Sequence, residues 1–406
     1  MASTLKLGNG NWGVKEDSLL AYRDKNNNFK SLPFDFSRAS SGTVVNKAGL
    51  IETVQSGEPR IDFKDDTKGA LLLEPQSTNL VTQSELFSDA SWVKSGLTVN
   101  SNQITSPSGN LTADLLIEGN SNSGHDIRYN ANLPYNTYIY SVFVKKYNGG
   151  GDRNLRFLIG GVNTSGSFNL STGLWSAATF DNPTAIDFGN GWWKLSFSDI
   201  GVAFNVITQL TNNGNVSYQG DGVSGVYIWG AQLEQNSFST SYIPTSGSAV
   251  TRVLDTCYND NLANVIGQTE GTFYLETVPL NSLTSYTERV IQFESSGSGF
   301  MTIQRYANDN ITFYGTNCSN NWSIQGTGLF VGGQTIKIAG AYKDNDITLY
   351  VNGVQIGTNT TANAPQIEKL RFANNTSGSL GYLGSHKDVK LYNTRLSNSE
   401  LAALTS

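Results

Sequence analysis

The stretch NCSNNW at residues 317–322 combines residue types that bind sugars. A sugar site usually presents an aromatic ring to the pyranose face and amide or hydroxyl groups to the ring hydroxyls. The candidate ligand-binding residues are therefore Trp322, Asn320, Asn321 and Tyr314. The alternative is that Trp322 fills a hydrophobic core, and the sequence leaves both interpretations open.

A second stretch, residues 344–346, reads DND and could hold a metal. Calcium prefers carboxylate and amide oxygens, so Asp344 and Asp346 are candidate metal ligands. The same residues commonly form a tight turn, because Asp and Asn tolerate left-handed backbone angles. We favour the turn, so calcium is an alternative and no cofactor is expected.

The residues form no recognisable catalytic set. The two histidines, His125 and His386, fall in different expected domains, and no serine has the G-x-S-x-G surroundings of a nucleophile elbow. Hydrolysis of a glycan needs two carboxylates at a defined separation. Glu276, Glu294 and Glu368 are isolated acids, so we expect no enzymatic activity. A hydrolase that draws its acids from scattered loops is the alternative.

The composition predicts a β-rich protein of two or three domains. The chain has 406 residues, of which 38% are hydrophobic and only 15% charged, and it contains 42 glycines. A surface poor in charge must be built from Gly, Asn, Ser and Thr, which are weak helix formers and common turn residues. Short strands joined by tight turns are expected.

Charge and hydropathy argue against several partners. The net charge is −6 without a run of Lys or Arg, so no nucleic-acid partner is expected. No stretch of about 18 apolar residues could span a membrane. The N-terminus lacks an apolar signal core, so we expect a protein made in a cytoplasm and not exported by the usual route. Cys257 and Cys318 could form a disulfide, although we favour two unlinked thiols.

Three parts are expected along the chain. Residues 1–82 hold short apolar words between turns, which predicts an extended anchor or oligomerisation segment, or alternatively an edge of the next domain. Residues 83–248 and residues 249–406 each contain short alternating runs that are typical of antiparallel strands. The predicted fold is all-β, with two antiparallel β-sandwich (jelly-roll) domains preceded by an extended N-terminal anchor segment.

Two local signals stand out in the last part. Residues 351–354 read VNGV, and Asn-Gly favours a two-residue hairpin turn because both residues accept positive φ angles. Residues 397–404 predict one short helix, with Ser397 as its N-cap and Glu400 three residues later. A hairpin and a terminal helix are therefore expected.

Several words in residues 5–87 resemble the opening of a family of phage tail and fibre proteins. In chain order they are LGNGNW, FDFSRAS, GLIET, EPRIDF and LEPQSTNL. The resemblance implies a structural protein of the virion, made in the cytoplasm of a bacterial host. It further implies a homo-oligomer, a trimer by analogy with phage fibres, in which residues 1–82 contact other capsid or tail proteins.

Two further stretches resemble known domains. The words YSVFVK, VYIWGAQLE and SYIPT in residues 83–248 are similar to the carbohydrate-binding-like jelly-roll of the same phage proteins. The words IAGAYK, ITLYVNG and DVKLYN in residues 249–406 resemble the concanavalin A-like lectin/glucanase superfamily, nearest its laminin-G and pentraxin-like branch. Its members often bind glycans, sometimes through calcium, so cell-surface glycans are the expected ligands.

The leading hypothesis is a non-enzymatic virion subunit, such as a head or tail fibre or a decoration protein, that adheres to host or environmental glycans. Two alternatives remain. A virion polysaccharide depolymerase predicts two facing carboxylates about 5–10 Å apart. A purely structural capsid or tail subunit predicts no exposed aromatic residue beside amides.

Overall fold

The computed structural model consists of antiparallel strands and one short helix, α1 (Asn398–Thr405), among its described residues. These are residues 3–23, 31–160, 164–201, 205–282, 287–297, 299–316, 321–364, 366–372 and 381–406. The predicted all-β fold is confirmed. No helix in these ranges is long and apolar enough to cross a membrane.

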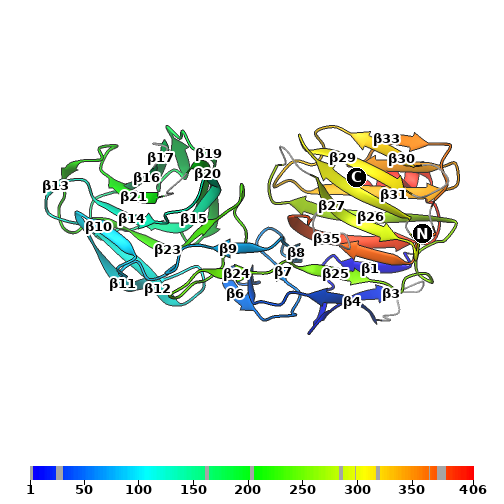
Figure 1. Cartoon of the computed structure of the whole chain (residues 1–406), viewed down its shortest axis with the longest axis horizontal. Helices are drawn as coiled ribbons and strands as arrows, with labels where there is room; N and C mark the ends of the chain where they lie inside the picture. The colour runs from blue at the N-terminus through cyan, green and yellow to red at the C-terminus, as the bar shows by residue number, and fades with distance from the viewer. Residues whose placement is uncertain are drawn as a thin grey trace. The chain divides into compact units, whose positions relative to one another are not determined.

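The strands group into two compact units (Figure 1). Unit 1 comprises Met1–Lys47, Thr53–Gln76 and Val253–Ser406, and unit 2 comprises Ala48–Glu52 and Ser77–Arg252. The boundary expected between residues 248 and 249 falls between residues 252 and 253. The structure shows no separate unit that ends at the expected boundary at residue 82. Most of the N-terminal segment belongs to the same unit as the C-terminal part.

Unit 1 is a β-sandwich. In pairing order, its first layer contains β30 (Trp322–Gly326), β29 (Asn310–Thr316), β28 (Phe300–Tyr306), β27 (Glu288–Glu294), β34 (Lys369–Phe372), β25 (Thr256–Asn259), β4 (Ser31–Ser37) and β3 (Ser18–Arg23). Its second layer contains β33 (Val354–Asn359), β32 (Ile347–Val351), β31 (Ile336–Lys343), β26 (Glu270–Pro279) and β35 (Gly384–Tyr392), with β1 (Leu5–Gly8) and β8 (Ala70–Leu73) beside β35.

The layers join where β1 pairs with β3 as well as with β35. Four further short strands are β2 (Gly13–Lys15), β5 (Gly42–Val45), β7 (Ile61–Asp62) and β6 (Ile51–Val54), and β6 lies partly in unit 2. Alternate residues of both layers face one shared hydrophobic core, as strand geometry requires.

The N-terminal strands complete the sandwich of the C-terminal part. In Figure 1, β1 lies beside β35 and β4 lies beside β25, although these partners are far apart in the sequence. Phe34 of β4 is fully buried, and its ring centre lies 5.5 Å from that of Phe372 in β34. The N-terminal segment is therefore part of unit 1 and no separate anchor, because its apolar side chains are buried in the core of that unit.

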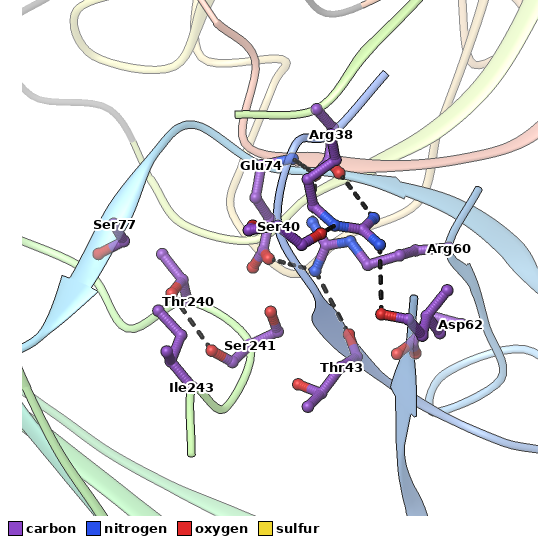
Figure 2. Close-up of polar contacts among 12 residues, drawn as sticks. Arg38, Ser40, Thr43, Arg60, Asp62, Glu74, Ser77, Thr240, Ser241 and Ile243 are labelled. Carbon is purple, nitrogen blue, oxygen red and sulfur yellow. Dashed lines mark hydrogen bonds and ion pairs between the residues drawn. The ribbon is translucent and has the colours of Figure 1, made fainter. Parts of the chain in front are cut away.

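A buried cluster of ion pairs connects three of the N-terminal sequence motifs to the start of the C-terminal part. Arg60 Nη1 pairs with Glu74 Oε2 at 2.7 Å and donates to the main-chain oxygen of Thr43, as Figure 2 shows. Asp255 accepts from both Arg60 and Arg38, the latter at 3.2 Å. The four charged side chains are fully buried. Burial opposes the charge on Arg60, but Asp255 and Glu74 outweigh it and raise its pKa.

Unit 2 is a sandwich of two six-stranded antiparallel sheets, as predicted for the middle of the chain. One sheet contains β10 (Trp92–Ser95), β14 (Asp126–Asn130), β21 (Asn205–Thr211), β16 (Asn154–Gly160), β17 (Thr164–Asn169) and β18 (Leu174–Ser176). The other contains β11 (Leu97–Thr105), β12 (Leu111–Glu118), β23 (Gly225–Glu234), β15 (Asn136–Lys146), β20 (Trp192–Gly201) and β19 (Asp181–Gly189). Two short pairs join β13 (Asn122–Ser123) to β22 (Tyr218–Gln219) and β9 (Ser77–Asn79) to β24 (Val250–Arg252).

The words GAQLE and SYIPT are structural in unit 2. Glu234, at the end of β23, is fully buried and accepts hydrogen bonds from the Ser77 hydroxyl and from the main chain and hydroxyl of Thr240. The main-chain N–H of Ile243 donates to Gln232 Oε1 at 2.6 Å. These contacts hold residues 240–243 against the end of β23, so the words stabilise the sandwich.

Both local signals are confirmed. The turn between β32 and β33 has positive φ angles at Asn352 (47°) and Gly353 (83°). Helix α1 begins with the predicted capping box of Ser397 and Glu400. Its Leu401 packs on the outer side of the second layer, in a small cluster with side chains of β31, β32 and β35.

The cysteines are tested only in part. Cys257 is a free thiol buried in the core of unit 1, and burial raises its pKa. Cys318 lies outside the described residues, so the state of this pair stays a prediction.

His386 should make unit 1 sensitive to acid. Burial lowers the pKa of its imidazole from 6.5 to about 3. Between these values the unfolded chain binds the proton and the folded chain does not, so this group stabilises the fold fully above pH 6.5 and progressively less as the pH falls towards 3. The free energy of unfolding should fall by about 1.4 kcal/mol per pH unit through this group.

The measurement is urea unfolding from pH 7.5 to 4.5, compared with His386→Asn. Burial raises the pKa of Glu288 to about 7, which gives the opposite slope between pH 4.5 and 7 in both proteins. The difference between the two curves isolates the histidine. Parallel curves would contradict the prediction.

Candidate functional site

The ligand-binding set predicted around Trp322 does not come together. Trp322 is only 4% exposed, and its ring packs edge-on against Phe313 at a centroid distance of 4.7 Å. Asn321 is exposed and accepts a hydrogen bond from Thr316 Oγ1 at 3.1 Å, while Asn320 lies outside the described residues. The interpretation of Trp322 as a sugar-stacking ring is wrong, because its position in the alternating strand β30 faces the core.

The stretch containing the two candidate calcium ligands forms the favoured turn. Asn345 has a φ of 61°, Asp346 pairs with Arg395 at 2.8 Å, and Asp344 accepts the main-chain N–H of Ala364 at 3.2 Å. Within the described ranges no group of three or more His, Cys, Asp or Glu side chains could hold a metal. Asp344 and Asp346 are engaged by protein partners, so the turn explains both carboxylates.

Of the predicted residues that the structure describes, only Tyr314 lies on an outward surface with an aromatic ring beside it. Its neighbours in β29, Phe313 and Gly315, are buried, and alternation directs Tyr314 away from the core. The ring of Phe300 in β28 meets it edge-on at 5.9 Å. Both rings are half-buried. We call the surface made by Arg289, Gln292, Glu294, Phe300, Tyr314 and Arg371 the outer face.

A row of polar groups crosses β27 and β34 on the outer face. Arg371 Nε donates to Glu294 Oε2 at 2.9 Å, and Gln292 donates to the other oxygen of Glu294. Arg371 also pairs with Asp260 at 3.0 Å, and its guanidinium lies 4.8 Å from the ring centre of Tyr258. The side chains of Arg371 and Glu294 are 13% and 12% exposed, so these groups are held in fixed positions.

Arg289 links the polar row to the rings. Its guanidinium lies 4.9 Å from the ring centre of Phe300, and its Nη1 donates to Gln292 Oε1 at 2.5 Å. Burial lowers the pKa of Arg289, and Glu294 and Tyr314 act in the opposite direction. A guanidinium close to an aromatic ring is also stabilised by the ring's negative face.

The outer face combines two half-buried rings with amide, carboxylate and guanidinium groups in fixed positions. Rings suit the apolar faces of sugars, and planar polar groups suit their hydroxyls. Sequence reasoning identified only Tyr314 of this set. The usable signal was the alternation of β27, in which Gln292 lies between the core residues Ile291 and Phe293 and Glu294 follows Phe293.

Comparison with known protein families gives a match for the C-terminal part of the chain. Residues 270–402 match the family described as the Concanavalin A-like lectin/glucanases superfamily. This part of the chain is a concanavalin A-like domain. The match includes β27, β28, β29 and β34, so the lectin-like domain supplies all six residues of the outer face. No curated protein matches the chain.

Solved structures similar to this chain include carbohydrate-binding proteins. The CBM40 of the Ruminococcus gnavus IT-sialidase, bound to α2,3-sialyllactose, is 14% identical over 36% of this chain and 86% of its own, with a TM-score of 0.31. Domain 4 of an extracellular arabinanase from Geobacillus stearothermophilus, with arabinotriose, is 13% identical over 42% and 84%, with a TM-score of 0.32. A heptameric SAP-like pentraxin from Limulus polyphemus is 13% identical over 34% and 70%, with a TM-score of 0.28. At these TM-scores the similarity carries no inference about a ligand.

Proposed function

We propose that this chain is a non-enzymatic structural subunit of a phage particle that binds glycans through the outer face of its lectin-like domain. The observation that carries the glycan-binding part is the convergence of two aromatic rings with fixed planar polar groups on one surface. The virion part rests on the ordered words of residues 5–87. The bacterial host, the homotrimer and the contacts with other virion proteins rest on the same resemblance.

The outer face suits an extended, polyhydroxylated ligand. Tyr314 and Phe300 offer ring surface, and the amide of Gln292 sits between the charged groups of Arg289 and Glu294. Because these side chains bond to one another, little side-chain entropy remains to be lost when a ligand binds. A preorganised face of this kind binds a ligand without rearrangement.

A glycan array probed with the full-length chain tests glycan binding. The full chain is required because the N-terminal strands complete the sandwich, so residues 255–406 alone lack part of their core. Binding to a set of related bacterial surface glycans is expected. Failure to bind any glycan, with and without calcium, would favour the purely structural subunit.

Tyr314→Ala should weaken glycan binding about tenfold, because truncation of a central aromatic contact commonly costs more than about 1 kcal/mol. The half-buried ring is not part of the core, so the melting temperature should change little. Binding is measured by calorimetry with the strongest array ligand. Tyr135→Ala, which removes a 66% exposed ring from unit 2, is the matched control and should bind normally.

The depolymerase alternative has one specific observation in its favour. Glu276 of β26 pairs in register with Asp388 of β35, so two carboxylates stand on one side of neighbouring strands, with Cα atoms roughly 4.5–5.5 Å apart. Burial raises the pKa of Asp388, as a general acid requires. Against this, Lys390 Nζ lies 2.5 Å from Asp388 and offsets its charge.

Release of reducing ends from bacterial polysaccharides tests this alternative. Our proposal expects none from the purified chain. If the wild type releases reducing ends and Glu276→Gln does not, the chain is a hydrolase that uses Glu276 and Asp388, and the non-enzymatic proposal is wrong.

Particle membership is tested by mass spectrometry and immunogold labelling of purified virions. The chain should remain with particles through density-gradient purification, and sedimentation of the free protein should give a trimer. Absence from purified particles would overturn the virion part and leave the binding part standing.

A further inference from the structure

Arg289 carries a charge that the described part of the chain does not neutralise. Arg305 and Arg371, on neighbouring strands, each have a carboxylate oxygen within 3.2 Å. Arg289 has none within ion-pair distance among the described residues. Its Nη1 donates to the neutral amide of Gln292, and its Nε is buried without a hydrogen-bond partner.

Leaving a half-buried guanidinium in this state is unfavourable. A buried donor without an acceptor destabilises a protein, and more so when the group is charged. Burial also lowers the pKa of Arg289, which shows that its surroundings disfavour the charge. An anionic group from outside the chain would supply the missing counter-charge.

The nearest acid does not serve this purpose. The two oxygens of Glu294 accept from Gln292 and from Arg371, so its charge is already offset. For the same reason Glu294 repels an incoming anion only weakly. Phe300 and Tyr314 lie beside the Arg289 guanidinium, so an anion that reaches it must be attached to a group that tolerates aromatic surface.

We propose that the outer face selects glycans that carry a carboxylate, and that Arg289 binds this carboxylate while the sugar ring lies against Phe300 and Tyr314. This inference rests on the proposed glycan binding and adds the ligand class. A carboxylate is favoured over a sulfate ester because a planar guanidinium matches its geometry. A neutral sugar could accept hydrogen bonds from Arg289 but would leave its charge without a counter-charge.

The test uses the full-length chain on an array of bacterial polysaccharides that contain uronic acids. Each is printed beside its carboxyl-reduced form, which keeps the backbone and removes the charge. Wild-type protein should bind the acidic form at least about tenfold more tightly. Arg289→Gln should lose about tenfold to hundredfold on the acidic form, since a hydrogen bond to a charged group contributes about 1.5–3 kcal/mol, and should lose less on the reduced form, so that the preference for the acidic form disappears.

Two further variants complete the design. Arg156→Gln makes the same change at a half-buried arginine of unit 2, whose Nη2 donates to Ser165 Oγ at 3.3 Å, and should bind like the wild type. Arg289→Lys retains the charge and should keep the preference for acidic forms with reduced strength, so the test survives if Arg289→Gln does not fold.

The failures are distinguishable. Equal binding of acidic and reduced glycans by the wild type overturns the carboxylate inference and leaves glycan binding intact. Binding to dextran sulfate without binding to any uronic-acid polymer also overturns it, in favour of a sulfate. Binding to no glycan at all removes both this inference and the proposed function.

Discussion

Asp255→Asn is expected to lower the free energy of unfolding of unit 1 by about 3–5 kcal/mol. Asp255 accepts from both Arg38 and Arg60, and its Oδ2 also accepts the main-chain N–H of Glu74 at 2.9 Å. The amide would remove a negative charge that two fully buried guanidiniums bond to. Breaking a buried pair in this way commonly costs 3–5 kcal/mol, because the surviving charges cannot be rehydrated.

Differential scanning calorimetry measures the effect. For a unit of this size each kcal/mol lowers the melting temperature by about 2–4 °C, so a decrease of about 6–20 °C is expected. The control is Asp152→Asn, which breaks the pair between Lys146 and a carboxylate that is 70% exposed. That change should stay within about 0.5 kcal/mol. Equal effects of the two substitutions would show that the buried cluster is dispensable.

Deletion of residues 1–76 is expected to prevent unit 1 from folding. The deletion removes fully or nearly fully buried side chains from its core, namely Leu5, Leu7, Leu19, Phe34, Phe36, Leu71 and Leu73. Truncating a single side chain of this kind costs about 2–5 kcal/mol. Whole domains are stable by only about 5–15 kcal/mol, so the loss exceeds what unit 1 can tolerate.

Calorimetry and hydrogen exchange of residues 77–406 would show the outcome. Unit 2 should retain its transition, because most of its strands lie within residues 77–252. Exchange protection should vanish from β26, β27 and β35. A truncated chain that keeps both transitions would restore the picture of a detachable anchor and contradict the pairing of β1 with β35.

The sequence predicted what is locally encoded. The hairpin turn at Asn352 and Gly353 and the capping box of Ser397 depend on residues within a few positions of each other, so their types suffice. The alternation in β30 was also readable. Trp322 lies two positions from Ile324, with polar Ser323 between them, a spacing that is typical of a strand with one buried face.

The sequence could not predict which strands pair. Three of the sequence motifs that resemble the phage family contribute to the buried ion cluster. Arg38, Arg60 and Glu74 come from separate motifs and meet Asp255 only after folding. The same holds for the outer face. Glu294 and Arg371 are brought together by the pairing of β27 with β34, which no local pattern specifies.

The pairing of β1 with β35 has a consequence during synthesis. Leu5 pairs with Leu391, so the first strand leaves the ribosome roughly 20–80 s before its partner at ordinary elongation rates. Unit 2 can fold during this time. The apolar side chains of β1, β3 and β4 stay exposed until β25 and β35, which pair with β4 and β1, have been synthesised. The N-terminal end of the nascent chain should therefore depend on chaperones. A truncated product that ends after unit 2 should aggregate through the exposed strands β1, β3 and β4.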